Sequence, residues 1–212
     1  AAFATGGSSP YRDQVLWLTW GGGDRGEHGK DLDDTSKTSA VLRVADGLDL
    51  EVTCGISNIV HDGGGATLKS YRPGDYDGDS LDKLYNIDGI NDANQLIAGI
   101  SKTGGKATFT ITCNSWLGGA PYDLRGLVMA DAESTAPGAV EYVEAKATGT
   151  WNVVEVRKNL SSGSYIATKP ASGEIRFGPG NNRNTAAVTF LSFTTPSNSV
   201  SMDFGLRGQG TQ

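Results

Sequence analysis

An acidic stretch near the middle of the chain contains the side chains whose types and spacing suggest chemistry most directly. Residues 71–96 read YRPGDYDGDSLDKLYNIDGINDANQL. Asp75, Asp77 and Asp79 alternate along it, and Ca²⁺ takes six to eight such oxygens in tight loops. The spacing is not that of an EF-hand, since the twelfth position is Asn86 rather than a bidentate acid. The stretch is therefore interpreted either as another type of calcium site at these three acids or as a helix cap at Asp79 with solvated turn acids beside it.

A second pair of acids follows the apolar segment GLVMA, at Asp131 and Glu133. On an extended chain, residues two apart share a face and lie roughly 7 Å from each other. Such carboxylates can accept hydrogen bonds from sugar hydroxyls or hold a cation. They could also be the acid and base of a glycosidase, whose carboxyls are roughly 5 to 9.5 Å apart. The spacing leaves these roles and a purely structural one open.

Aromatic side chains in loops suggest a third type of contact, because sugar faces stack on Trp and Tyr rings whose polar tips stay hydrated. Tyr76 lies between two aspartates, and Trp116 lies in the loop-like segment CNSWLGGAPYD together with Tyr122. The ligand-binding candidates are therefore Tyr76, Asp77, Trp116, Asp131 and Glu133.

Several other functions lack the residues they need. The net charge of −6 offers no basic footprint for nucleic acid, and no apolar run reaches the roughly 18 to 20 residues of a membrane span. The chain's two histidines lie outside any HxH or HExxH pattern, and GxSxG and phosphate-loop motifs are absent. We expect no nucleic-acid partner, no membrane insertion and no enzymatic activity.

Composition and periodicity predict an all-β fold. Thirty glycines supply tight turns between short alternating segments. Helical periodicity is restricted to residues 79–85 and 92–100. We expect residues 1–212 to form a single domain, a two-sheet lectin-like or jelly-roll sandwich with one or two short helices. The predicted strands are residues 14–20, 40–45, 48–54, 107–113, 124–130, 140–145, 148–156, 164–168, 174–177, 185–193 and 199–206.

The two cysteines end segments with clean alternation, LDLEVTC and ATFTITC. Cys54 and Cys113 each share a face with the apolar residues of their segment, so both side chains should point to the core. A disulfide between them would join two sheets or two neighbouring strands, and it would indicate an oxidising, extracellular setting. The alternative is a pair of buried thiols.

Several segments along residues 5–156 match a known pattern in order. They read GGSSPYRDQVLWLTWG, LEVTCGISNI, LKSYRPGDYDGDSLDKLYNIDGINDANQLIAGI, FTITCNSWLGGAPYDLRGLVMADAES, EYVEA and TWNVVE. The most specific elements are SYRPG followed by GDSLDKLYN, and GLVMADAE preceding EYVEA. Together they resemble the non-repetitive adhesive domain of CshA/CshB-type fibrillar adhesins.

The resemblance implies a lectin-like β-sandwich at the outer end of a bacterial surface fibril, which attaches to host glycoproteins, matrix proteins or other cells. Such a domain binds rather than transforms its ligand, and it is part of a longer surface protein. The GD…LD..YN pattern belongs to the shared framework of that family, which favours a structural role for Asp79 and Tyr85. The chain itself contains no sortase signal and no fibril repeats.

Three functions follow from these observations. The first is an extracellular adhesin domain that binds a carbohydrate or glycoprotein through loops at the sandwich edge, with possible calcium assistance. The second is a lectin-fold enzyme that degrades polysaccharides with Asp131 and Glu133. The third is a structural or protein-binding module. We expect the first, since the chain lacks the reactive groups of most enzymes.

Overall fold

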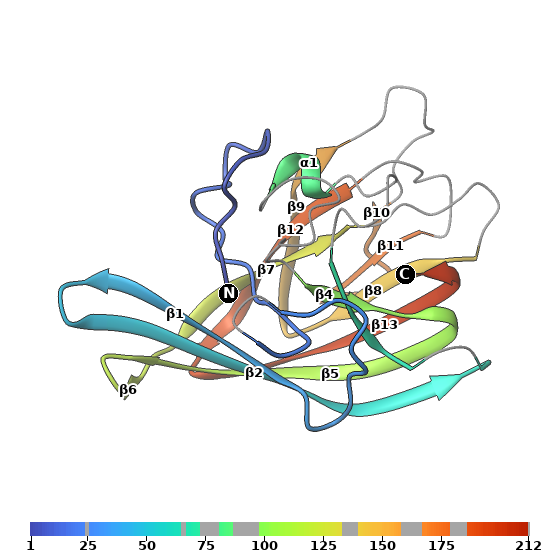
Figure 1. The fold of residues 1–212 in the computed structure, drawn as a ribbon, viewed down its shortest axis with the longest axis horizontal. Coiled ribbons are helices and arrows are strands. Elements are labelled where there is room, and N and C mark those ends of the chain that lie inside the picture. The colour runs from blue at the N-terminus through green and yellow to red at the C-terminus, as the bar shows by residue number, and fades with distance from the viewer. Residues whose placement is uncertain are drawn as a thin grey trace.

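The computed structural model shows a two-layer arrangement of strands, with a large sheet beneath a smaller one and a short helix above it (Figure 1). The residues that the structure describes are 1–23, 26–64, 67–72, 81–86, 98–132, 140–157, 167–178 and 186–211. Every strand pair described in these ranges is antiparallel. Antiparallel pairing is typical of sandwiches whose strands are joined by short turns.

The large sheet has the strand order β1-β2-β5-β13-β8-β11-β10, and β6 pairs with β5 beside this path. Its central strands are long because the alternation of their sequences continues well past the expected ends. The bounds are β1 Lys37–Ala45, β2 Leu48–Asp62, β5 Thr103–Leu117, β6 Ala120–Pro121, β8 Tyr142–Lys146, β10 Ala167–Thr168, β11 Glu174–Phe177 and β13 Ser199–Thr211.

The small sheet has the order β7-β12-β9, and a separate pair joins β3 to β4. The only helix described in these ranges is α1, which is a single turn at Leu81–Leu84. The remaining bounds are β3 Lys69–Tyr71, β4 Gly99–Ser101, β7 Leu124–Asp131, β9 Gly149–Arg157 and β12 Ala186–Ser197.

The main hydrophobic core lies between the two sheets. Phe109 and Met202 contribute from the large sheet, while Trp151 and Leu191 contribute from the small one. The faces predicted from alternation are confirmed, since Ala107, Phe109, Ile111 and Cys113 are all buried. The structure therefore confirms an all-β sandwich.

The predicted disulfide is present between Cys54 and Cys113. The two residues lie directly opposite each other on β2 and β5, with their Cα atoms 4.0 Å apart. The bond therefore links neighbouring strands within the large sheet rather than the two sheets. It is fully buried in the core, as the alternation indicated.

A second hydrophobic cluster covers the other face of the small sheet. There Val188 of β12 packs with Leu84 of α1 and with Val15 and Trp17 near the N-terminus. The ring of Trp17 meets that of Tyr85 edge-on, with centroids 5.0 Å apart. The N-terminal segment and α1 thus shield one end of a face that would otherwise expose apolar side chains to water.

Two of the predicted elements are wrong in part. Residues 14–20, called the strap below, form an extended segment with a single isolated bridge between Trp17 and Ala2 instead of a strand. Its alternation is real, because Val15 and Trp17 bury on one side and Leu18 and Trp20 pack on the other. Alternation with a period of two residues arises here because side chains are buried on both sides of the segment. It does not require a hydrogen-bonded partner strand.

The helix predicted at residues 92–100 ends wrongly, because Gly99 and Ile100 belong to β4. Apolar residues at Ile97 and Ile100 fit either a helix or a strand in so short a segment. The part before residue 98 lies outside the described residues. The helix predicted at residues 79–85 is confirmed over Leu81–Leu84, Tyr85 lies beyond its end, and residues 79 and 80 lie outside the described part of the chain.

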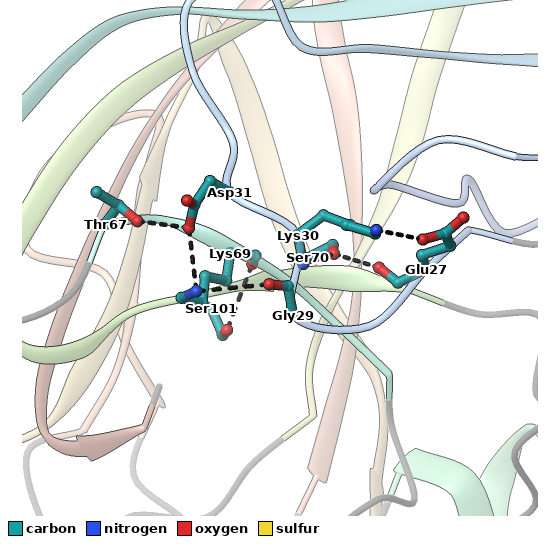
Figure 2. A network of polar contacts seen from close by, with 8 residues as sticks. All are labelled: Glu27, Gly29, Lys30, Asp31, Thr67, Lys69, Ser70 and Ser101. Carbon is teal, nitrogen blue, oxygen red and sulfur yellow. Dashed lines mark hydrogen bonds and ion pairs between the residues drawn. The ribbon is translucent and has the colours of Figure 1, made fainter.

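Residues 26–32 attach to β3 through a compact polar network (Figure 2). The carboxylate of Asp31 accepts hydrogen bonds from Thr67 at 2.9 Å and from the Lys69 ammonium at 3.0 Å. The Lys69 ammonium, followed by the Thr67 hydroxyl, holds the pKa of Asp31 below its usual value. Ser70 donates to the backbone carbonyl of Glu27. These groups satisfy one another, so the network fixes the loop and offers little to a ligand.

Candidate ligand-binding surfaces

Most of the sequence-predicted site residues lie outside the described part of the chain. This holds for the calcium candidates Asp75, Asp77 and Asp79 and for the ligand candidates Tyr76 and Glu133. In the ranges that the structure does describe, no group of three or more His, Cys, Asp or Glu side chains could hold a metal ion. Calcium binding therefore stays a prediction.

The loop predicted around Trp116 is wrong at this residue, because Trp116 belongs to β5. It lies on the outer face of the large sheet, near the turn between β5 and β6. Its neighbour Ser115 is fully buried, so alternation turns Trp116 away from the core. Glu51 of β2 and Pro121 of β6 lie opposite it in the register. Tyr122, which is 39% exposed, follows directly. The backbone N–H of Tyr122 donates to the carbonyl of the buried Ser115 at 3.1 Å, so Tyr122 lies opposite Ser115 rather than opposite Trp116. We call Glu51, Trp116 and Pro121 the hairpin surface.

Asp131 occupies a different environment at the end of β7. It pairs with Ala187, a residue of the main core, and it is only 5% exposed. Asp131 is seven residues from Leu124 at the other end of β7, a distance of roughly 23 Å along a strand. Since Tyr122 comes just before Leu124, the structure does not bring Asp131 and Trp116 together on one surface.

A polar groove of about 390 Å³ lies on the outer face of the large sheet. Two neighbouring cross-strand rows form most of it, and we call it the outer groove. One row contains Thr110, Asp203, Lys146 and Glu174, from β5, β13, β8 and β11 in turn. The next row contains Thr108, Gly205, Glu144 and Arg176 from the same four strands.

The glycine in the second row makes room for the side chain of Glu144. A Cβ atom at Gly205 would lie 2.6 Å from Oε1 of Glu144 and 2.8 Å from its Cγ. Such distances are shorter than van der Waals contact, so the missing side chain is what lets Glu144 lean across β13. The Glu144 side chain therefore occupies the space above position 205, between Thr108 and Arg176 in the second row.

Charges in the outer groove are arranged in opposite pairs. Arg176 donates to one carboxylate oxygen of Glu144 through Nη2 at 2.5 Å and through Nε at 3.0 Å. Its guanidinium also lies over the ring of Tyr142, 4.6 Å from the centroid. Lys146 and Glu174 form a longer pair at 3.4 Å. Thr110 donates to Asp203 at 2.8 Å.

This arrangement can form many hydrogen bonds with a polar ligand at once. The row of Thr110, Asp203 and Lys146 offers a hydroxyl, a carboxylate and an ammonium, and the second carboxylate oxygen of Glu144 adds an acceptor. The backbone beneath is held by the ladders of long strands, so the groups are positioned before a ligand arrives. The groove therefore suits a polyhydroxylated or charged ligand.

Sequence reasoning missed most of the groove. The alternation of residues 199–206 by itself puts Asp203 and Gly205 on the face opposite to Met202 and Phe204, and Glu144 lies in the segment EYVEA. However, Lys146, Glu174 and Arg176 come from segments whose neighbours are set by the strand order. Nothing in the local sequence indicates that β8 lies between β13 and β11.

The chain is similar to a known protein family. Residues 13–212 match the family model described as surface adhesin CshA non-repetitive domain 2. No curated protein and no solved structure gave a match.

The matched range includes nearly all of the chain, so the protein belongs to the CshA non-repetitive domain 2 family of surface adhesins. Membership supports an adhesin role and implies a location at the cell surface. No helix that the structure describes has the length and apolar character needed to cross a membrane.

Proposed function

We propose that this domain is the ligand-binding part of a longer extracellular surface protein, and that it binds a carbohydrate or glycoprotein through the outer groove. The observation that supports this most is the clustering of Thr110, Asp203, Glu144 and Arg176 in a groove of about 390 Å³. Sugar hydroxyls both donate and accept, and the groove offers both kinds of partner. The family supplies the adhesive role.

The hairpin surface is a second contact in this proposal. Trp116 was expected from the sequence to stack on a sugar ring, with Tyr122 beside it. The surface is on the same outer face as the groove, because Asn114, Thr112 and Thr110 continue the outward alternation of β5 from Trp116. A long glycan or a glycoprotein could contact both. Asp131, Tyr76, Asp77 and Glu133 remain candidates for contacts elsewhere.

The proposal is tested by a glycan array and by titration against matrix glycoproteins, before and after enzymatic removal of their glycans. We expect binding that is lost with the glycans. Binding that survives deglycosylation would instead support a protein-binding module. A folded sample that binds neither glycans nor glycoproteins would contradict the proposal.

A variant that fills the groove identifies the site. Gly205→Val places a branched side chain against Glu144, a change that a strand tolerates because the flexible acid can move. We expect at least a tenfold loss of affinity with a small change in melting temperature. The matched control is Asn152→Val, at an exposed position of β9 in the small sheet and outside the groove lining. Equal losses in both variants would place the ligand elsewhere.

Calcium assistance through Asp75, Asp77 and Asp79 is a separate part of the proposal. A cation that binds only the folded chain raises the melting temperature by mass action. We expect a rise with Ca²⁺ that is absent with Mg²⁺, which demands a stricter geometry. The triple variant with asparagine at the three positions should lose the rise. No shift with Ca²⁺ would leave these acids in a turn and a cap.

Binding without turnover is the last part of the proposal. The alternative, a polysaccharide-degrading enzyme that uses Asp131 and Glu133, predicts product release from a polysaccharide panel. We expect no products in such an assay. Turnover that disappears in Glu133→Gln would overturn the adhesin proposal in favour of the enzyme.

A further inference from the structure

A band of short polar side chains connects the outer groove to the hairpin surface. It lies on the outer face of the large sheet, where β2, β5 and β13 run side by side (Figure 1). Two neighbouring cross-strand rows form this band, which we call the polar strip: Thr53, Asn114 and Ser199 in one row, and Gly55, Thr112 and Ser201 in the other. The intervening residues Cys54, Cys113 and Val200 are buried, so the strip faces away from the core.

The strip is continuous with both surfaces along β5. Every second residue of this strand from Thr108 to Trp116 points to the outer face, so the groove, the strip and the hairpin surface follow one another. The eight residues from Thr108 to Trp116 span roughly 27 Å of extended chain. A compact ligand reaches only one end of this span, whereas an extended chain reaches both.

The chemistry of the strip is that of an uncharged ligand. It contains hydroxyls, one amide and one glycine, and no charged side chain lies within it, although Lys37 and Glu51 border it in the register. The hydroxyls of Thr112 and Ser201 hydrogen-bond to each other at 2.8 Å, and the pair keeps further donor and acceptor capacity for a ligand. A charged chain would lose its water here without gaining an opposite charge. Sugar hydroxyls would exchange water for groups of their own kind.

An extended peptide is a poorer occupant of this face. A peptide that joins a sheet needs a free strand edge, where its backbone continues the hydrogen-bonded ladder. The strands β2, β5 and β13 are internal to the large sheet and are paired on both sides. Their outer face offers side-chain groups only, so a peptide lying across it would leave many of its own backbone groups without partners.

We propose that the outer groove, the polar strip and the hairpin surface together bind an uncharged, linear polysaccharide in an extended conformation, with its axis along β5. This inference rests on the proposed function, because the groove holds one end of the chain. The ring of Trp116 stacks on a sugar at the other end. A span of roughly 27 Å holds about half a dozen sugar units.

Titration calorimetry with cello-oligosaccharides and chito-oligosaccharides of two to eight sugar units tests the length of the site. Both series are uncharged and form straight ribbons. We expect the affinity to rise at least tenfold from the disaccharide to the hexasaccharide and to change little beyond it. Maltohexaose is the matched control, because it has the composition of cellohexaose but coils, and it should bind no more tightly than a disaccharide.

Two outcomes of this titration separate the inference from the proposed function. If the disaccharide binds as tightly as the hexasaccharide in both series, the extended path along β5 is wrong and the outer groove alone remains the proposed site. If neither series binds, the inference is overturned, while the glycan array decides independently whether the domain binds other glycans.

A double variant tests the strip itself. Thr112→Val with Asn114→Leu removes a hydroxyl and an amide from its centre with little change in side-chain shape. We expect the hexasaccharide affinity to fall at least tenfold, with disaccharide binding and the melting temperature nearly unchanged. The matched control is Thr150→Val with Asn152→Leu, which makes the same two changes at exposed positions of β9 in the small sheet.

Equal losses in the two double variants would overturn the inference, because the strip would then have no specific effect. The same conclusion would follow if the strip variant lost disaccharide and hexasaccharide binding alike. Binding of a deglycosylated matrix protein that the strip variant abolishes would show that the occupant is a peptide, which also contradicts the inference.

Discussion

Asp82 is an example of how burial changes the chemistry of a single side chain. The sequence places it in the acidic stretch, where a solvated acid would be expected. In the structure it lies on α1 and is only 2% exposed. Desolvation raises its pKa from 3.8 to about 6, partly opposed by the nearby Lys83. Ionisation of the Asp82 carboxyl is therefore unfavourable when no cation is bound. A group of this kind does not suit a calcium ligand.

Stability should therefore depend on pH through Asp82. Its pKa is higher in the folded chain than in the unfolded one, so protonation favours folding. As pH falls from neutral through about 6 toward 3.8, this group should add up to about 3 kcal/mol to the free energy of unfolding. Asp82→Asn should remove that contribution and be more stable than the wild type at neutral pH. Urea unfolding across this range checks it; an identical slope in both proteins would contradict it.

Residues in the outer groove show what sequence can and cannot predict at this scale. The face on which Asp203 lies follows from alternation alone, because neighbours two apart share a side of a strand. The contact between Arg176 and Glu144 does not, since it depends on β11 lying beside β8. Buried acids such as Asp82 are equally hard to recognise, because Asp in a turn and Asp in a first helical turn look the same in sequence.

At the scale of elements, the disulfide determines how firmly β2 is attached to β5. The two strands are already paired along most of their length, and Cys54 faces Cys113 in the register. The bond closes a loop with a sequence separation of 59 residues. It thus restricts the unfolded chain more than it alters the folded sheet.

Replacing both cysteines with alanine should lower the free energy of unfolding by about 4 kcal/mol in the chain-entropy description. The register of β2 on β5 should persist, because its hydrogen bonds remain. Urea unfolding measures the loss, and reduction of the wild type with dithiothreitol should reproduce it. A double variant as stable as the oxidised protein would contradict this account.

Trp17 connects the strap to the segment that contains α1. Its ring is 9% exposed and packs edge-on against Tyr85. Tyr85 in turn donates to Glu155 of β9 at 3.0 Å, and Ser9 donates to the same oxygen at 2.9 Å. These contacts join the N-terminal segment, α1 and the small sheet.

Trp17→Ala should therefore cost about 3 kcal/mol or more, as large-to-small changes at buried aromatic residues do. Tyr122→Ala removes an aromatic ring that is 39% exposed and should cost less than 1 kcal/mol. Denaturant unfolding of both variants checks the contrast. If Trp17→Ala lowered the free energy of unfolding no more than Tyr122→Ala does, the strap would contribute little to the stability of the fold.

The strands themselves were largely predictable, and their ends were less so. Nearly every predicted alternating segment corresponds to a strand, because burial on one face imposes period two. The strap was mistaken for a strand, since both of its faces bury without a continuous hydrogen-bonded partner. The bulge in β2 near Asn58, whose φ is 56°, has no local signature beyond the tolerance of Asn for that conformation.

At the scale of the whole molecule, the two layers are unequal. The large sheet provides a broad outer face with the groove and the hairpin surface, while the small sheet covers only part of its inner face. The class of fold follows from composition, turns and alternation. The strand order does not, because it depends on contacts between residues far apart in sequence, such as Asp203 with Thr110 and Lys146.

The adhesive role is a property of the family, and the outer groove is where we propose that this chain performs it. Amide and side-chain NMR shifts, recorded with the glycan that binds most tightly in the array, test this most directly. The account predicts that the largest shifts cluster at Thr110, Glu144, Arg176 and Asp203. Shifts confined to the turn between β5 and β6, or to the strap, would contradict it.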